Sequence, residues 1–179
     1  ALTLEEQNRS LWDRQLAQRG YECLDKAMRL GHPGPYQIQG AIAAMHCLAR
    51  RSEETDWAKI LALYDSLLQI DDSPVVRLNR GVALAMSGAP ERALELVQSL
   101  PLEHYPLYHA TLAELQKRLG RPWQASLQQA LRLETNLAAR KSLILRLEEP
   151  PRPFGTGGDE RLAIPDSANP DPDSHNRHT

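Results

Sequence analysis

The sequence predicts an all-α protein of about eight helices, paired as antiparallel hairpins in a short stack. Leu and Ala supply 29 and 21 of the 179 residues, whereas Val and Ile together supply only ten. This shortage of β-branched residues disfavours a sizeable sheet. Apolar residues recur at helical spacing through residues 1–149, and proline or glycine marks nearly every joint between segments. A chain of this length buries a core without needing a disulfide or metal.

Capping residues define the predicted elements in order. The helices are expected over residues 10–30, 35–49, 57–70, 74–88, 90–100, 105–119, 122–133 and 136–148. The first helix starts near Ser10 and ends at Gly31, and Pro35 takes the first position of the second. Thr55 or Asp56 caps the third. Ser73-Pro74 starts the fourth helix, which ends at Gly88. Pro90 starts the fifth helix. The sixth helix ends at Gly120, and Pro122 starts the seventh.

A sequence repeat supports the hairpin stack. Gly88-Ala89-Pro90 recurs further along the chain as Gly120-Arg121-Pro122, and the same spacing aligns Ala93 with Ala125. The segment from Leu78 to Val97 resembles the tetratricopeptide pattern, with Gly81 and Ala93 at its small positions. Small residues at such places let paired helices approach closely. The alternative is an ordinary helical bundle.

The composition changes at Pro150. Residues 150–179 hold six of the 13 prolines and few apolar residues, so we expect a disordered tail there. Residues 1–149 form the helical domain and carry equal numbers of positive and negative side chains, which excludes a DNA binder held by phosphate electrostatics. The chain begins with Ala1 rather than Met, so we expect it to belong to a longer protein.

Catalytic and metal-binding signatures are absent from the sequence. None of the six histidines forms a His-Glu-x-x-His pair, and no nucleophile elbow, phosphate loop or dinucleotide fingerprint occurs. We therefore expect no enzymatic activity, cofactor or metal. Cys23 and Cys47 form no disulfide framework, which fits a reducing compartment such as the cytoplasm. No apolar run is long enough to span a membrane.

The segment from Gly34 to His46 holds the main candidate binding residues. At 100° per residue its helix has three stripes. An apolar stripe predicts core contacts and consists of Ile38, Ile42, Met45 and Ala49. A stripe of small residues predicts close packing of another helix and consists of Gly40, Ala44 and Cys47. A polar stripe consists of Tyr36, Gln39, Ala43 and His46. The polar stripe is either a partly buried hydrogen-bonded network or the wall of a groove that receives a partner.

Further candidates open the fourth helix. Arg77, Asn79 and Arg80 either form a solvated charged face or contact a ligand, with Asn79 where tetratricopeptide units present side chains to their concave face. Trp12 and Trp57 are interpreted as indoles that close core edges between helices.

Four ordered motifs carry a resemblance to a known family. They are RSLWDRQL from Arg9, GPYQIQGAIAAMH from Gly34, TDWAKILALYDSLL from Thr55 and SPVVRLNRGVALA from Ser73. Together they resemble the long helical, tetratricopeptide-like C-terminal extension of a group of bacterial extracytoplasmic-function sigma factors. The resemblance covers about residues 1–149 and implies a cytoplasmic transcription-initiation factor that binds RNA polymerase. It also implies that the extension modulates sigma activity and that a small YCII-related protein is a candidate partner.

One feature of that group is missing from these 179 residues, namely a helix-turn-helix with a basic recognition helix. The predicted function is therefore that of a regulatory domain, which contacts the sigma core, RNA polymerase or a small protein. The alternative is a sensor whose residues Tyr36, Gln39 and His46 line a pocket for a small ligand. A cryptic enzyme is the third hypothesis.

Overall fold

Every regular element that the structure describes is an α-helix. The computed structural model describes residues 13–31, 33–49, 54–148 and 150. Its eight helices are α1 (Arg14–Arg29), α2 (Pro35–Leu48), α3 (Trp57–Leu68), α4 (Pro74–Met86), α5 (Pro90–Gln98), α6 (Pro106–Arg118), α7 (Gln124–Leu133) and α8 (Leu137–Glu148). The predicted all-α fold is confirmed. Ser10, Trp12 and all of the expected tail except Pro150 lie outside the described residues.

Side-chain caps fix the starts of several helices. The Oδ1 atom of Asp56 accepts a hydrogen bond from Lys59 N at 3.0 Å, so Asp56 rather than Thr55 is the cap of α3. Ser73 Oγ accepts from Val76 N at 3.3 Å and caps α4 as predicted. Asp13 Oδ1 accepts from Leu16 N at 2.9 Å, and α1 begins directly after it, later than the predicted start.

The ends of α4 and α6 repeat the same motif at the predicted spacing. Gly88 and Gly120 have φ angles of 105° and 66°, a left-handed conformation that glycine adopts without strain. Ala89 N donates to Leu84 O at 3.2 Å, and Arg121 N donates to Gln116 O at 2.8 Å. These bonds satisfy carbonyl groups at the helix ends in the manner of a Schellman motif.

The start of α7 departs from the repeat. Pro122 is the predicted first residue, but α7 begins at Gln124, because Trp123 has the non-helical angles φ −128° and ψ −15°. A shift of two positions rotates a helix face by about 200°. Ala125 is consequently exposed, whereas Ala93 is fully buried, and the predicted equivalence of these two alanines is wrong. Leu127 and Ala130 supply the buried face of α7 instead.

Three successive hydrophobic clusters make up the core of the described residues. The first joins α2, α3 and the start and middle of α4, and Leu24 of α1 packs against its edge. The second joins α4, α5 and α6, and the third joins α6, α7 and α8. A bundle around one centre would give one shared cluster, so this succession favours the stack of hairpins over the bundle alternative.

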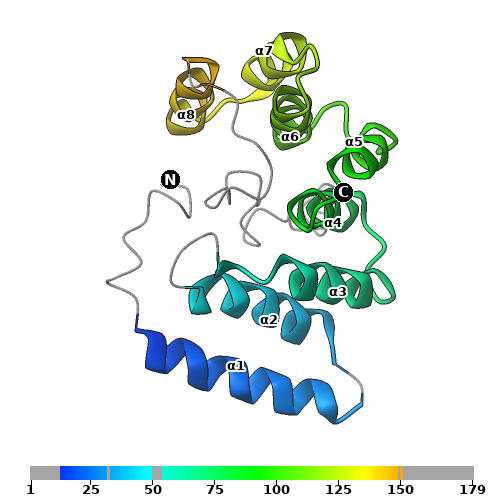
Figure 1. Cartoon of the computed structure of the whole chain (residues 1–179), viewed down its shortest axis with the longest axis vertical. Coiled ribbons are helices and arrows are strands. Elements are labelled where there is room, and N and C mark those ends of the chain that lie inside the picture. The colour runs from blue at the N-terminus through cyan, green and yellow to red at the C-terminus, as the bar shows by residue number, and fades with distance from the viewer. Residues whose placement is uncertain (1–12, 32, 50–53, 149, 151–179) are drawn as a thin grey trace, which may run out of the picture.

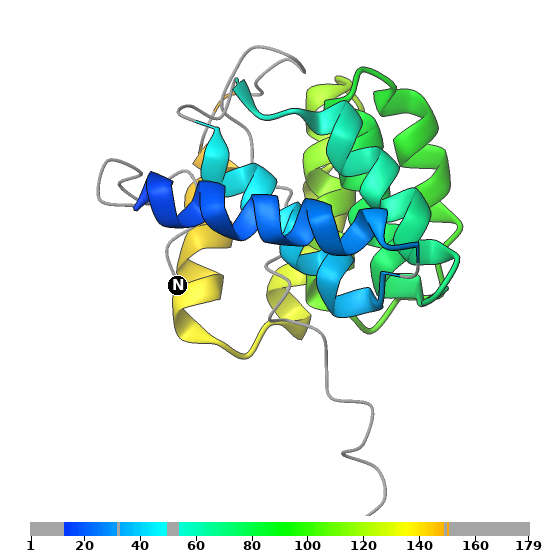
Figure 2. The same ribbon diagram turned by 90° about the horizontal axis from the view of Figure 1, so that it is seen from below.

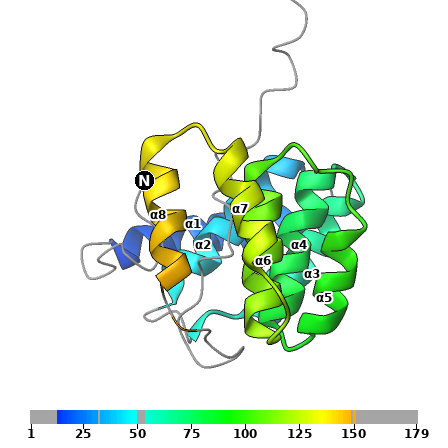
Figure 3. The ribbon, with the colours of Figure 1, turned by 90° about the horizontal axis from the view of Figure 1, so that it is seen from above.

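Consecutive helices pack against one another along the chain, and α4 also contacts α6. Figure 1 shows the resulting arc, with α4 and α6 on its inner side and α5 and α7 on its outer side. From above, α4, α5 and α6 stand side by side (Figure 3). From below, α1 crosses the direction of α4 and α5 (Figure 2), so the helix direction turns along the stack.

The close approach of α4 and α5 depends on Gly81. A Cβ atom at this position would lie 2.7 Å from Val97 Cγ2 of α5. Ordinary carbon–carbon contacts are about 3.5–4.0 Å. Ala93, the other small residue of the predicted pattern, is fully buried in the same interface. The structure thus supports the prediction that small residues at these two places let the hairpin close.

Candidate interaction surface

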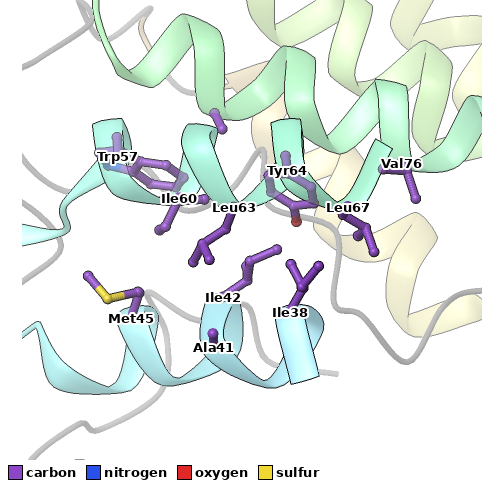
Figure 4. Packing of buried hydrophobic residues seen from close by; sticks show 11 residues of the cluster. Ile38, Ala41, Ile42, Met45, Trp57, Ile60, Leu63, Tyr64, Leu67 and Val76 are labelled. Carbon is purple, nitrogen blue, oxygen red and sulfur yellow. The ribbon is translucent and has the colours of Figure 1, made fainter. Parts of the chain in front are cut away.

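The apolar stripe of α2 forms one side of the first cluster. Ile38 and Ile42 are 0% and 2% exposed, and both lie against α3 (Figure 4). Met45 and Ala49 of the same stripe are also buried. Pro35 occupies the first position of α2, where its missing N–H group leaves no helical hydrogen bond unmade.

The stripe of small residues on α2 receives α1. A Cβ atom on Gly40 would lie 3.3 Å from Leu24 Cδ1 of α1, which is tighter than an ordinary contact. The absence of a side chain at this position therefore allows α1 to pack closely on α2. The prediction of a neighbouring helix at Gly40 is confirmed.

The residues of the polar stripe on α2 differ in their exposure to solvent. Tyr36 is 84% exposed at the start of the helix, and Gln39 is half-buried. His46 is buried, and its ring meets the Trp57 ring edge-on, with 5.3 Å between centroids and 70° between planes. As a correction to the open-groove interpretation, His46 belongs to the edge of the core, because Trp57 covers it. Trp57 itself closes this edge, as predicted.

Both arginines that open α4 have carboxylate partners. Arg77 binds Asp72 through two hydrogen bonds of 2.6 Å, from Nε to Oδ1 and from Nη2 to Oδ2. The Arg77 guanidinium lowers the pKa of the Asp72 carboxyl, and the carboxylate raises the pKa of Arg77. Arg80 Nε donates to Asp65 Oδ1 of α3 at 2.6 Å. These pairs neutralise the surface at the α3–α4 turn, so it does not present an unbalanced positive charge to a ligand.

Asn79 lies on the opposite side of α4 from Arg77. Positions two apart in sequence are separated by about 200° around a helix. Asn79 is 8% exposed, and within the described residues its Oδ1 atom accepts no hydrogen bond. The Asn79 side chain therefore offers a buried acceptor on α4. The six predicted residues do not form one continuous surface, because they include exposed, paired and buried side chains on two separate helices.

Buried polar side chains on α6 were missed by the sequence analysis. The Arg118 side chain is fully buried, and its Nε atom donates to Glu114 Oε1 at 2.8 Å. Its Nη1 atom lies 3.7 Å from Met86 Sδ and so links α6 to α4. Lys117 is also buried, with Nζ 4.7 Å from the Trp123 ring centroid. The four-residue spacing of Glu114 and Arg118 was the available signal, but it is equally typical of an exposed pair.

Tyr105 lies where the chain enters α6, at the edge of the second cluster. Within the described part of the chain its Oη atom is buried without a hydrogen-bond partner. Burial raises the pKa of this hydroxyl group. Asn79 on α4 and Tyr105, directly before α6, therefore each carry a buried oxygen atom that has no hydrogen-bond partner within the described residues.

The described residues contain no group of three or more His, Cys, Asp or Glu side chains that could hold a metal ion. His109 Nε2 lies 2.8 Å from Glu103 O, and its ring packs edge-on against Tyr108. No helix in the described ranges is long and apolar enough to cross a membrane.

Comparison with known proteins identifies a longer relative. The chain is 43% identical over 149 residues to an uncharacterized protein of Rhizobium meliloti (strain 1021). The match covers 81% of this chain and 35% of the relative, so the chain spans about a third of the relative's length. No protein-family model matches the chain. No solved structure matches it.

Proposed function

We propose that this chain is a regulatory domain of a bacterial extracytoplasmic-function sigma factor and acts by binding protein partners. The observation that carries the proposal is the match to a longer protein, of which the matched region makes up 35%. A helical region that recurs within a longer polypeptide fits an accessory domain, and the additional length can hold the promoter-binding parts. Those parts are expected from the sigma-factor resemblance and are missing from the 179 residues.

The three resembling motifs in the described residues correspond to one structural unit. They cover α2, α3 and α4 with the caps of α3 and α4, and their apolar residues meet in the first cluster. Core packing thus accounts for most of the motif pattern. The residues left over for recognition are the exposed ones, of which Tyr36 is the largest in α2.

The proposed mechanism is binding rather than catalysis. The domain docks on the sigma core, on RNA polymerase or on a small YCII-related protein in the cytoplasm, and so changes how much sigma factor enters promoter complexes. The balanced charge of residues 1–149 suits protein contacts better than contacts with DNA.

Transcription from a cognate promoter tests this proposal. The full-length protein that contains this chain should bind core RNA polymerase and start transcription in vitro. Tyr36→Ala should weaken transcription or partner capture at unchanged stability, because it removes an exposed aromatic side chain. Leu16→Ala in α1, also at an exposed position, is the matched control and should have no effect. A full-length protein that neither binds polymerase nor depends on residues 13–148 would overturn the proposal.

A small-ligand sensor for the same sigma factor is the second candidate. The buried Asn79 Oδ1 atom, which accepts no hydrogen bond within the described residues, favours it, because a donor on a ligand would satisfy this acceptor. Native mass spectrometry of the purified chain distinguishes the small-ligand sensor from the protein-binding domain. A stoichiometric small molecule that is lost in Asn79→Leu supports the sensor, and its absence supports the protein-binding domain.

A further inference from the structure

The exposed side chains that the structure describes on α8 are apolar except for Lys141. Leu137, Ile144 and Leu145 are 83%, 46% and 51% exposed, and Ala138 and Lys141 are exposed beside them. Their offsets of one, four, seven and eight positions place all five on one stripe. Leu143, on another side of the helix, is 7% exposed and packs in the third cluster with α6 and α7. The helix therefore has apolar side chains both toward the stack and away from it.

The outer helices of the stack differ from α8 in this respect. The exposed side chains of α5 are polar and include Glu91, Arg92, Glu95 and Gln98. Those of α7 include Gln124, Gln128 and Arg132. A helix at the end of a stack normally presents such a polar face to water. α8 lies at one end of the arc in Figure 1, and exposed apolar residues gathered on one stripe are typical of an interaction site.

We propose that residues 154–164 of this chain cover the exposed face of α8. This segment contains the large apolar residues Phe154, Leu162 and Ile164, and the acidic pair Asp159-Glu160 followed by Arg161 gives it a net charge of −1. The apolar side chains match the stripe, and the carboxylates complement Lys141 at its middle. A segment with too few apolar residues to form its own core can still become ordered on an existing surface.

The length of the connection allows this docking. The chain from Glu148 to Leu162 has a reach of about 46 Å when extended. A helix of 12 residues such as α8 is about 18 Å long. Leu162 can therefore reach any point along the stripe without strain in the connecting chain.

A second copy of the chain fits the stripe less well. Lys141 lies midway between Leu137 and Leu145, so a two-fold axis centred on these two leucines would pass beside it. Lys141 would then face Lys141 of the other copy, and like charges placed directly opposite each other oppose association. An acidic apolar segment avoids this repulsion and gains a favourable contact at the same point.

A photo-crosslink in the 179-residue protein tests the location. Leu162 is replaced by benzoylphenylalanine, the sample is irradiated at low concentration, and the linked peptides are identified by mass spectrometry. The expected product is an intramolecular link to residues 137–145. Links only to other helices, or only between two chains, would overturn the proposal.

Hydrogen exchange of the full chain tests the chemistry of the contact. The double variant Leu162→Ser/Ile164→Ser should speed amide exchange in α8 by about five-fold or more, because the cover is lost. Asn169→Ser/Asn176→Ser changes the same part of the chain outside the segment and should leave α8 unchanged. Asp159→Lys/Glu160→Lys should also speed exchange, and adding Lys141→Glu should reverse that effect. Unchanged α8 exchange in both segment variants would refute the proposal.

Discussion

Replacement of Gly81 by alanine is expected to destabilise the domain, although alanine is the better helix former. The added Cβ atom would lie 2.7 Å from Val97 Cγ2, about 1 Å inside an ordinary carbon–carbon contact. Val97 is fully buried on α5, and a β-branched side chain has little rotamer freedom with which to move away. Relief therefore requires α4 and α5 to separate.

The magnitude follows from two opposing effects. Alanine in place of glycine within a helix contributes about 1 kcal/mol of stability. Overpacking of a well-filled core costs about 1–3 kcal/mol. The expected net result for Gly81→Ala is a loss of about 1 kcal/mol in the free energy of unfolding.

Gly20 provides a matched control within the same chain. It lies inside α1, and a Cβ atom there would have nothing within 4 Å. Gly20→Ala should therefore stabilise the protein by about 0.5–1 kcal/mol. The difference between the two variants measures the steric clash alone, because the helix-propensity gain is common to both.

Urea denaturation of the two variants beside the parent chain gives these values. In a Val97→Ala background the clashing methyl group is absent, so Gly81→Ala should become neutral or stabilising. Equal changes for Gly81→Ala and Gly20→Ala, or no rescue by Val97→Ala, would refute the reasoning about close packing of α4 on α5.

Three further predictions concern the surface and the edge of the core. His46→Ala should lower the free energy of unfolding by about 1–3 kcal/mol, because His46 packs against Trp57. Gln39→Ala should lower it by less than about 1 kcal/mol. Equal losses for the two variants in thermal melts would contradict this prediction. Because Arg77 lowers the folded-state pKa of Asp72, the pair's stabilising effect is present above the ordinary aspartate pKa of 3.8 and is lost as the pH falls through the lowered value. In Arg77→Ala the carboxyl pKa, followed by NMR titration, should return toward its ordinary value. The isolated chain should not bind promoter DNA, and salt-sensitive, sub-micromolar binding of a duplex would show that the charge argument is wrong.

Local signals in the sequence were sufficient to predict most of the fold. Pro35, Ser73 and Gly88 act through their own backbone or a neighbour within a few residues, so their effects were readable without tertiary context. The small size of Gly81 also pointed correctly to a close helix contact. The repeat spacing holds for α4 and α6, since the first residues and the terminal glycines of these two helices are offset by the same number of positions.

Features that depend on distant side chains were predicted less well. The start of α7 shifts because Trp123 takes non-helical angles, and a proline signal at Pro122 does not reveal this. The polar stripe of α2 has one sequence pattern but two environments, since Trp57 covers His46 and leaves Tyr36 exposed. Sequence periodicity predicts which residues share one face of a helix. It does not predict which of them are buried, because that depends on residues of other helices.

The division of the core into three clusters limits how far a local loss of packing spreads through the domain. Each cluster shares only one helix with the next, α4 or α6. In such a linear array each interface depends mainly on its immediate neighbours. Loosening at α8 therefore weakens the third cluster first and reaches the α2–α3 pair only through two shared helices. Packing at one end of the described array can accordingly loosen while the other end keeps its structure.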